Sequence, residues 1–362
     1  MGGQKIQDRF GRPLTDLRLS VTDRCNFRCR YCMPREAVDS GDFLKRSEIL
    51  SYEEMVRLAG LFTELGVSKV RVTGGEPLLR KDLTYLLKEL SGLGVDLALT
   101  TNGSLLQEQA MALRKAGLGR VTVSLDALDE ELFQEISDAP GTSAQNVLAG
   151  IEASLSAGFE SIKVNCVVKR GCNESQILPL VRAFSHRPVE LRFIEYMEVG
   201  SRNDWSHESV FSAREILQVL QEVGPCVPIE RRSPGETAIR YDLKRLGLQV
   251  GLISSVSQPF CGECSRARVS AEGRLYDCLF AHDSLDLKAI LRSGATDREL
   301  MAVISEFWSR RTARFSENAR RAAAGIESFD GSASARATQG QFVSVDRLRR
   351  RRGRVEMSRI GG

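Results

Sequence analysis

The sequence contains very little histidine and no long apolar run. Its only three His are His186, His207 and His282, and they form no HExxH motif, so a histidine-based zinc enzyme is disfavoured. No stretch approaches the roughly 18 consecutive apolar residues of a transmembrane helix, so none is predicted. The N-terminal segment MGGQKIQDRFGRPLTDLRLS lacks the apolar core of a secretory signal, and we therefore expect a cytoplasmic protein.

The composition excludes wholesale disorder and does not suggest a disulfide scaffold. The chain is 42% hydrophobic and 27% charged, which is typical of a globular protein that buries a core. Its nine Cys would stay reduced in a cytoplasm, so their spacing is more informative than their number. At roughly 150 residues per domain, 362 residues predict two domains or one large barrel with an extension.

The C-terminal 54 residues are strongly basic. Residues 309–362 carry thirteen Arg and five acids, a charge of +8, which leaves −4 for residues 1–308 within the total of +4. The Arg-rich run at 347–354 indicates either a nucleic-acid arm or a solvated segment. No aromatic residue is interleaved with it, so a stacking platform for single strands is not indicated. We favour the solvated segment, whose charge would also steer anionic ligands toward the protein.

Short β-branched runs alternate with amphipathic helical stretches. Strands are expected at 17–22, 69–73, 95–101, 120–126, 161–168 and 189–195. Helices are expected at 51–65, 83–90, 105–116, 143–157 and 173–185. Ser51 and Glu54 would form a capping box for the first helix, and Asp82 would cap the second. Six such units predict an α/β fold with a parallel sheet, as a partial (βα)6 TIM-like barrel, with a doubly wound open sheet as the alternative.

Alternation along these strands places a group of cations on one face. Apolar residues such as Leu17 and Val70 would face the covering helices, so their neighbours would line the concave interior. These interior residues are Arg18, Lys69, Arg71, Lys163 and Arg192. Burying such charges costs several kcal/mol each unless they are compensated. A polyanion such as a triphosphate would compensate them, and the alternative is pairing with internal acids such as Asp126 or Glu190.

Two sets of three cysteines are spaced for metal binding. Cys25, Cys29 and Cys32 have CxxxCxxC spacing and follow the first strand, where barrel active sites form. Cys261, Cys264 and Cys278 form the second set. Three thiolates on a four-iron cluster leave one iron open for a ligand. The alternatives are a zinc knuckle at the first set and, at the second, a zinc site completed by His282.

Other residues complete these patterns. Gly74-Gly75-Glu76-Pro77 follows the second strand, and its glycines would let the backbone approach a ligand closely. Arg266 and Arg268 lie within the second cysteine set. The remaining cysteines, Cys166, Cys172 and Cys226, are expected to be ordinary small apolar residues.

The segments CNFRCRYC and GGEP resemble the signatures of the radical S-adenosylmethionine (SAM) superfamily. The further segments LTTNG, VSLDA, IKVNCVV, RFIEYMEVG and CGECSRAR and the terminal Gly-Gly resemble the GTP 3',8-cyclase family (molybdenum cofactor biosynthesis protein A). The resemblance covers residues 8 to about 308 and the last few residues, whereas 309–354 match no pattern of the family. It implies a radical SAM barrel over 1–225, a C-terminal part with an auxiliary Fe-S cluster over 226–308, and a basic tail over 309–362.

The resemblance also implies residue roles. The two cysteine sets would hold two [4Fe-4S] clusters. The SAM site would be lined by Tyr31, Gly75, Ser124 and Met197. GTP would be bound by Arg18, Lys69, Arg71, Thr101, Lys163, Arg192, Arg266 and Arg268. The catalytic site would be completed by the terminal Gly361 and Gly362.

The implied reaction is a radical, SAM-dependent lyase reaction of molybdenum cofactor biosynthesis. GTP would become (8S)-3',8-cyclo-7,8-dihydroguanosine 5'-triphosphate through a bond between ribose C3' and guanine C8. The implied partners are a flavodoxin- or ferredoxin-type reductant, a downstream cyclic pyranopterin monophosphate synthase and a second copy in a homodimer, with no membrane. Two alternatives are kept: a peptide-modifying radical SAM enzyme with an auxiliary cluster, and a non-catalytic protein that binds metal and nucleic acid.

Overall fold

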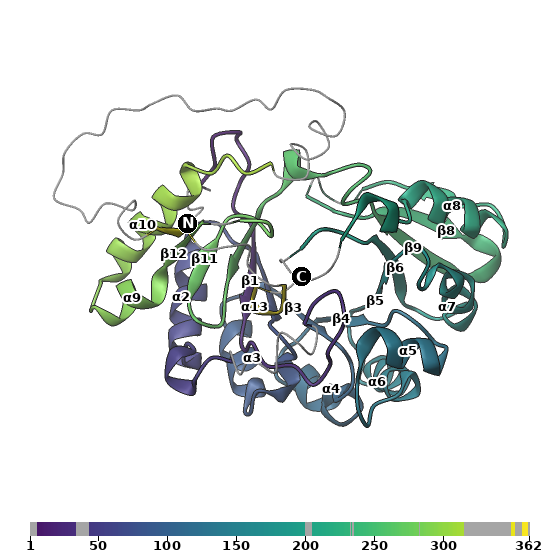
Figure 1. The fold of residues 1–362 in the computed structure, drawn as a ribbon. Coiled ribbons are helices and arrows are strands. Elements are labelled where there is room, and N and C mark those ends of the chain that lie inside the picture. Colours follow the sequence, from purple (N-terminus) through teal and green to yellow (C-terminus); the bar gives the residue numbers. More distant parts are fainter. Residues whose placement is uncertain are drawn as a thin grey trace.

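The described residues form a single curved sheet covered by helices. A computed structural model describes residues 6–33, 43–199, 205–231, 233, 235–281, 283–314, 349–351 and 357–360. Across these ranges the strand order is β13-β12-β11-β10-β1-β2-β3-β4-β5-β6-β9-β8-β7. Figure 1 shows the sheet curving so that the connecting helices lie on its outer side and α13 lies within the curve.

The centre of the sheet confirms the predicted parallel strands. Strands β1 to β6 are parallel neighbours in chain order. Their bounds are Asp16–Ser20 (β1), Lys69–Thr73 (β2), Asp96–Thr101 (β3), Arg120–Ser124 (β4), Ser161–Val168 (β5) and Glu190–Glu195 (β6). Because all six run in the same direction, their C-terminal ends meet at one edge, where a ligand site can form.

Further strands extend both sides of this centre. The first on each side pairs in parallel with it, and the outer ones are antiparallel. β9 (Leu248–Ile253) pairs in parallel with β6 and antiparallel with β8 (Ile239–Leu243), which pairs with β7 (Val227–Ile229). On the other side, β10 (Arg266–Val269) pairs in parallel with β1. It is followed by antiparallel β11 (Arg274–Tyr276), β12 (Asp283–Asp286) and β13 (Arg349–Arg351). The C-terminal part therefore belongs to the same sheet and brings the second cysteine set beside β1.

Helices connect the strands along the outer side. They are α2 (Tyr52–Glu64), α3 (Leu83–Ser91), α4 (Leu106–Lys115), α5 (Glu130–Ser137), α6 (Ala144–Ser156), α7 (Ile177–Ala183), α8 (Ala213–Gln221), α9 (Leu287–Arg292) and α10 (Asp297–Ser309). The short helix α13 (Met357–Ile360) lies inside the curve instead (Figure 1). The capping box of Ser51 and Glu54 is confirmed. The predicted cap at Asp82 is wrong, because this residue adopts a left-handed conformation (φ 59°) and its side chain makes no capping hydrogen bond.

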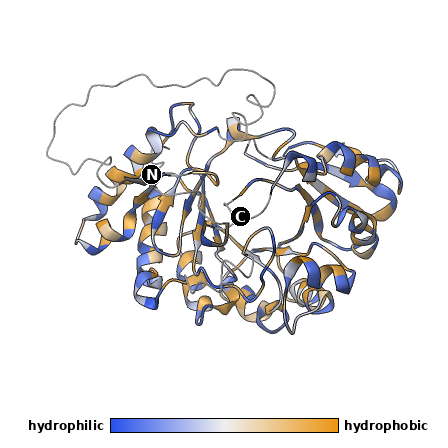
Figure 2. Cartoon of the chain, viewed as in Figure 1, coloured by the Kyte–Doolittle hydropathy of each residue, from blue (hydrophilic) through white to orange (hydrophobic). Residues whose placement is uncertain are grey.

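The two faces of the sheet differ as the alternation predicts. Leu17, Leu19, Val70 and Val72 are fully buried in the core beneath the helices. Hydrophobic and hydrophilic residues alternate around the outer helices, as amphipathic helices require (Figure 2). The helices lie outside the curve rather than on both faces, which favours the partial barrel over the doubly wound alternative.

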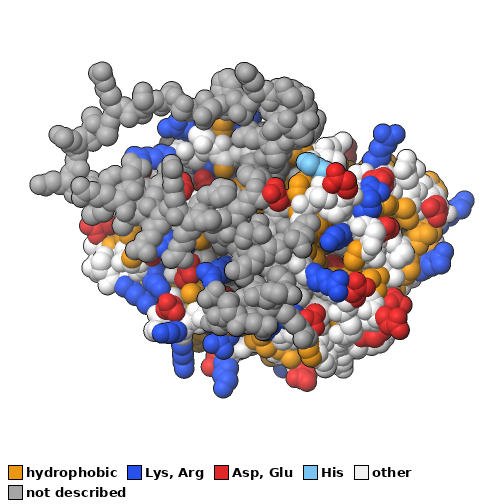
Figure 3. Space-filling model, in the orientation of Figure 1, with side chains coloured by type: hydrophobic (Ala, Val, Ile, Leu, Met, Phe, Trp, Pro, Cys, Tyr) orange, Lys and Arg blue, Asp and Glu red, His pale blue; other side chains and the backbone are white. Residues whose placement is uncertain are grey.

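The surface carries charges of both signs. On the face shown in Figure 3, Lys, Arg, Asp and Glu side chains of the described residues are interspersed on the right-hand side. In the ranges given above, every helix is too short or too polar to cross a bilayer.

Candidate active site

The first cysteine set lines a pocket at the C-terminal ends of β1 to β4. Cys25, Cys29 and Cys32 are joined there by Thr73, Gly74, Gly75, Thr101, Asn102, Ser124 and Asp126. The Tyr31 hydroxyl lines the same pocket and donates to Asp126 Oδ2 at 2.5 Å. The structure thus brings together the three thiols and three of the four residues expected at the SAM site.

The loop after β2 is packed against the backbone of the cysteine loop. A Cβ on Gly75 would lie 2.2 Å from the carbonyl oxygen of Arg24, and one on Gly74 would lie 2.4 Å from that of Thr22. Glu76 is fully buried and accepts from Thr101 Oγ1 and from the Asn102 N–H, both at 2.7 Å. Burial raises the pKa of Glu76 to about 7 despite these hydrogen bonds. The loop therefore presents a tightly positioned backbone and a buried carboxyl group to the pocket.

The thiols of this pocket suit a cluster that they would bind as thiolates. Burial raises the pKa of Cys25 to about 11, and it raises that of Cys29 well above its ordinary value. Binding of a cluster would therefore release the thiol protons, and the iron would stabilise the negative charge of the thiolates that remain. Within the described ranges, no three His, Cys, Asp or Glu side chains are grouped to hold a single metal ion. The three thiols, with no other cysteine or histidine among the described residues that line the pocket, are a donor set that fits an iron–sulfur cluster.

Replacing Gly75 with Ala is expected to damage both stability and SAM binding. The new methyl group would meet backbone atoms, which cannot rotate away, so we expect a loss of about 1–3 kcal/mol of unfolding free energy. The matched control is Gly60→Ala in α2, where the nearest atom lies 4.0 Å away and a helical Ala is favoured. Thermal unfolding and SAM titration of both variants test this, and wild-type behaviour of Gly75→Ala would contradict it.

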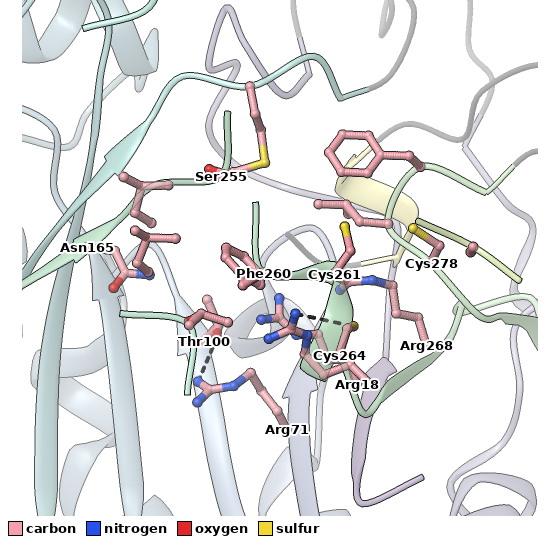
Figure 4. Close-up of a pocket in the computed structure, with 18 of the residues that line it drawn as sticks. Arg18, Arg71, Thr100, Asn165, Ser255, Phe260, Cys261, Cys264, Arg268 and Cys278 are labelled. Atoms are coloured by element: carbon pink, nitrogen blue, oxygen red, sulfur yellow. Dashed lines mark hydrogen bonds between the residues drawn. The ribbon is translucent and has the colours of Figure 1, made fainter. Parts of the chain in front are cut away.

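The second cysteine set lines a larger pocket inside the curve of the sheet. Cys261, Cys264 and Cys278 lie beside Arg18 and Arg268, and Asn165 lies across the pocket from them (Figure 4). The structure therefore brings the second set together with the arginines expected to bind GTP.

The thiols of the second set differ in their electrostatic surroundings. Burial acts to raise the pKa of Cys264, but Arg266 and Arg311 outweigh it and bring that pKa to about 6. The Arg266 Nη2 donates to Cys264 Sγ at 3.3 Å. Burial raises the pKa of Cys278 to about 11. The guanidinium groups thus favour a thiolate at Cys264, the form that binds iron.

The predicted interior cations line a third cavity that continues the second. Lys69 and Lys163 line this cavity, and Arg18, Arg71, Arg192 and Arg266 line both. Burial, and then the neighbouring guanidinium groups, lower the pKa of Arg18 to about 10 and that of Arg71 to about 9. The same causes lower the pKa of Lys163 to about 7. The cavity therefore has an excess of positive charge that an anion would relieve.

Internal acids neutralise part of this charge. Glu190 Oε1 accepts from Arg192 Nε at 2.5 Å, and Glu190 Oε2 lies 3.7 Å from Lys163 Nζ. Asp16 Oδ2 lies 3.4 Å from Lys69 Nζ. The alternative of internal pairing is thus confirmed for Glu190. It is wrong for Asp126, which accepts from Tyr31 instead. The Lys and Arg side chains that line the cavity still outnumber its Asp and Glu side chains, so pairing does not remove the excess.

Thr100 connects the first pocket with the second. It lines both, and its Oγ1 accepts from Arg71 Nη1 at 3.1 Å. Asn165 lines the second pocket with its buried Oδ1 lacking a hydrogen-bond partner. The sequence analysis assigned neither residue a role, although the alternation of β5 already placed Asn165 on the interior face beside Lys163. The second cavity thus adjoins the first at Thr100 and shares several arginines with the third.

Two residues line a different pocket from the other residues expected to bind the same ligand, and three more lie outside the described ranges. Met197, expected at the SAM site, lines the second pocket. Thr101, expected at GTP, lines the first pocket and donates to Glu76. Gly361, Gly362 and His282 lie outside the described residues. In α13, just before the terminal glycines, Met357 lines the first pocket and Ile360 is fully buried.

Comparison with known proteins assigns the family. The model of the Radical SAM superfamily matches residues 19–184, and that of Molybdenum Cofactor Synthesis C matches residues 189–317. A GTP 3',8-cyclase of Staphylococcus carnosus (strain TM300) is 47% identical over 318 residues, which cover 87% of this chain and 93% of that protein. The chain belongs to the GTP 3',8-cyclase family. A second member, from Staphylococcus aureus (strain JH9), is 46% identical over the same shares of both chains.

Solved structures agree with the fold of this family member. The crystal structure of Streptococcus suis SuiB bound to S-adenosylmethionine has a TM-score of 0.59 and 16% identity, covering 85% of this chain and 68% of that one. Family membership confirms the predicted radical SAM fold and a SAM-dependent radical enzyme with a [4Fe-4S] cluster. The matched regions meet between residues 184 and 189, and the predicted boundary at 225 stays a prediction.

Proposed function

We propose that this chain converts GTP into (8S)-3',8-cyclo-7,8-dihydroguanosine 5'-triphosphate, with SAM bound in the first pocket and GTP in the second and third. The observation that carries the proposal is that a cysteine-and-glycine pocket adjoins a second cysteine pocket, which shares its arginines with a cationic cavity. A nucleoside triphosphate has the complementary shape, with one compact base and a polyanionic tail.

The cations of the third cavity would hold the triphosphate. Lys69, Lys163 and Arg192 line this cavity, and Arg18, Arg71 and Arg266 extend it toward the second cysteine set. An anion there would offset the desolvation that lowers the pKa values of Arg18, Arg71 and Lys163. Anchoring the tail fixes the ribose and base near the first pocket, and such positioning is the main contribution of a protein to cofactor chemistry.

The residues around the two cysteine pockets would orient the reacting groups. When bound, SAM and the first cluster supply one-electron chemistry that removes a hydrogen atom, and the second cluster offers an open iron to the base. Gly74 and Gly75 would hold the methionine end of SAM against the backbone, with Glu76 buried behind them. Thr100, between the two pockets, and Asn165, facing the second, would contact the ribose. The buried position of these groups excludes water from the reaction.

The remaining expectations concern partners and location. We assign the electron supply to a flavodoxin- or ferredoxin-type protein and the next step to a cyclic pyranopterin monophosphate synthase. The reaction would take place in the cytoplasm, in a homodimer. The net positive charge of residues 309–362, much of it in the Arg-rich run at 347–354, would steer GTP toward the cavity, an effect that salt would weaken.

An anaerobic turnover assay tests the proposed function. The protein, loaded with iron and sulfide, is incubated with SAM and dithionite, with GTP, with ATP and without nucleotide. We expect 5'-deoxyadenosine to rise with GTP, together with a product that has the same mass as GTP and separates from it on chromatography, because GTP loses one hydrogen atom to the radical and regains one as an electron and a proton. GTP deuterated at C3' should transfer its deuterium to 5'-deoxyadenosine. ATP tests whether the base matters as well as the triphosphate.

The outcomes separate the candidate functions. SAM cleavage that leaves GTP unchanged would refute the cyclase and favour the peptide-modifying alternative. Absence of SAM cleavage in a brown, cluster-loaded sample would refute the radical enzyme. Deuterium retained in the product would contradict abstraction at C3' even if GTP were consumed.

A further inference from the structure

A buried ion-pair network lies behind the second cysteine set, outside the predicted site residues. Asp8 Oδ2 accepts from Arg12 Nε at 2.6 Å and from Arg311 Nη1 at 3.3 Å. The three side chains are between 0% and 2% exposed. Burying two guanidinium groups around one carboxylate leaves a net positive charge in the interior, which is costly unless it serves a nearby anion.

Both guanidinium groups reach the loop of the second cysteine set. Arg12 Nη1 donates to the Cys261 carbonyl at 2.7 Å, and Arg311 Nη1 donates to the Cys264 carbonyl at 2.6 Å. Arg311 also lies over the ring of Trp308, 4.5 Å from its centroid. The Trp308 Nε1 in turn donates to the Arg12 carbonyl at 3.2 Å. The network therefore ties the N-terminal segment and the end of α10 to the cysteine loop.

Arg311 also faces the ligand side of the loop. It lines the second pocket together with the three cysteines, whereas Asp8 does not line that pocket. A cluster held by three thiolates becomes more negative when it is reduced, so a buried cation beside it favours the reduced form. The negative charge of the Asp8 carboxylate disfavours the reduced cluster and so weakens the stabilisation that Arg311 provides.

We propose that Arg311, held at the loop by the Cys264 carbonyl and the Trp308 ring, is a positioning residue that raises the reduction potential of the cluster on Cys261, Cys264 and Cys278. The inference rests on the second cluster of the proposed function. It assigns Arg311 no contact with GTP and no part in SAM cleavage. Its position inside the segment expected to be a basic tail shows that at least one arginine of that segment is buried and specific.

The test is a redox titration of the second cluster in the full-length chain, with the first cysteine set replaced by Ala so that one cluster contributes. Potential is read by EPR and visible absorption, and iron content and circular dichroism report on integrity. For Arg311→Gln we expect at least a tenfold fall in the ratio of reduced to oxidised cluster at a fixed potential. For a one-electron couple this is about 59 mV toward more negative potential.

Two further variants distinguish charge from general damage. Asp8→Asn should shift the potential in the positive direction, because it removes a negative charge from the same network. Arg240→Gln is the matched control, since Arg240 is also a buried arginine but is paired with Glu236. In this variant the reduction potential of the second cluster should stay at the wild-type value. Opposite shifts for Arg311→Gln and Asp8→Asn would support the proposal, because loosening of the loop has no reason to reverse sign.

Other results would overturn it. Shifts in the same direction, or unchanged potentials with intact clusters, would show that the charge of Arg311 does not set the potential. Should Arg311→Gln fail to hold iron, Arg311→Lys decides, because it keeps the charge. Full iron content in Arg311→Lys, with a ratio of reduced to oxidised cluster within threefold of wild type at the same fixed potential, would support the proposal. Iron loss or a larger change in this ratio would refute it. Absence of iron at the second set of the otherwise unaltered protein would instead refute the second cluster of the proposed function.

Discussion

Alanine at Cys25, Cys29 and Cys32 is expected to abolish SAM cleavage, whereas alanine at the second cysteine set should abolish only conversion of GTP. The physical reason is that the two sets line different pockets, and the glycine loop after β2 lines the first pocket alone. SAM reduction requires a cluster next to that loop. With the first set intact, uncoupled 5'-deoxyadenosine formation should therefore continue at a rate within about tenfold of wild type, since the second cluster contributes no group to the SAM pocket.

The measurement is 5'-deoxyadenosine and nucleotide product by mass spectrometry, after anaerobic loading with iron. Iron content should fall by about half for each triple variant. Cys172→Ala and Cys226→Ala are the matched controls, because these partly buried thiols line neither cysteine pocket and should leave both products at wild-type levels. SAM cleavage that survives removal of the first set, or stops on removal of the second, would contradict the assignment of the pockets.

Binding of GTP is expected to weaken as pH rises above 7, because Lys163 must be charged to hold a phosphate. Burial, and then the proximity of Arg192, lower the pKa of Lys163 to about 7 in the ligand-free protein. Arg71 and Arg120 act in the same direction, and Glu190 opposes them. A bound triphosphate favours the ammonium form and so raises this pKa, which means that binding above pH 7 takes up a proton. We expect the dissociation constant to rise roughly 15-fold from pH 7 to pH 8.5.

Calorimetric titration with GTP, in the absence of SAM and reductant, measures this effect without turnover. Buffers of different ionisation enthalpy report the proton uptake directly. Lys163→Arg keeps its charge over this range, so its affinity should vary little with pH. Lys88→Arg, a change on the exposed side of α3, is the matched control and should retain the wild-type pH dependence. A flat wild-type profile would exclude Lys163 as the titrating contact.

Local periodicity determined the parts of this protein that depend on neighbours in the chain. The β-branched runs predicted the six central parallel strands, β1 to β6, but not β9 and β10, which pair in parallel with β6 and β1. Their alternation predicted which side chains face inward, including Arg18, Arg71 and Lys163. Both patterns succeed because a strand turns successive side chains to opposite faces whatever surrounds it. The cysteine spacing likewise placed Cys25, Cys29 and Cys32 in one pocket, since residues a few positions apart on one loop cannot separate far. Cys278 reaches Cys261 and Cys264 through the antiparallel pairing of β10 and β11.

Tertiary structure decided what depends on residues distant in sequence. The antiparallel edges contain strands as short as Val227–Ile229, which carry too few residues to show a period. Met197 and Thr101 entered other pockets than expected, because a residue at a strand end can turn toward either of two adjacent cavities and only packing selects one.

The ion-pair network behind the second cysteine set is the clearest example of a feature that the sequence alone could not predict. Asp8 and Arg311 are 303 residues apart, and neither belongs to a motif that the sequence displays. The sequence alone determined the parallel sheet, the two cysteine sets and the inward cations, because each follows from the local geometry of the chain. Only the tertiary structure decided that one arginine of a basic segment is buried against a cluster loop, because the energy of a buried charge depends on which distant partner folding brings beside it.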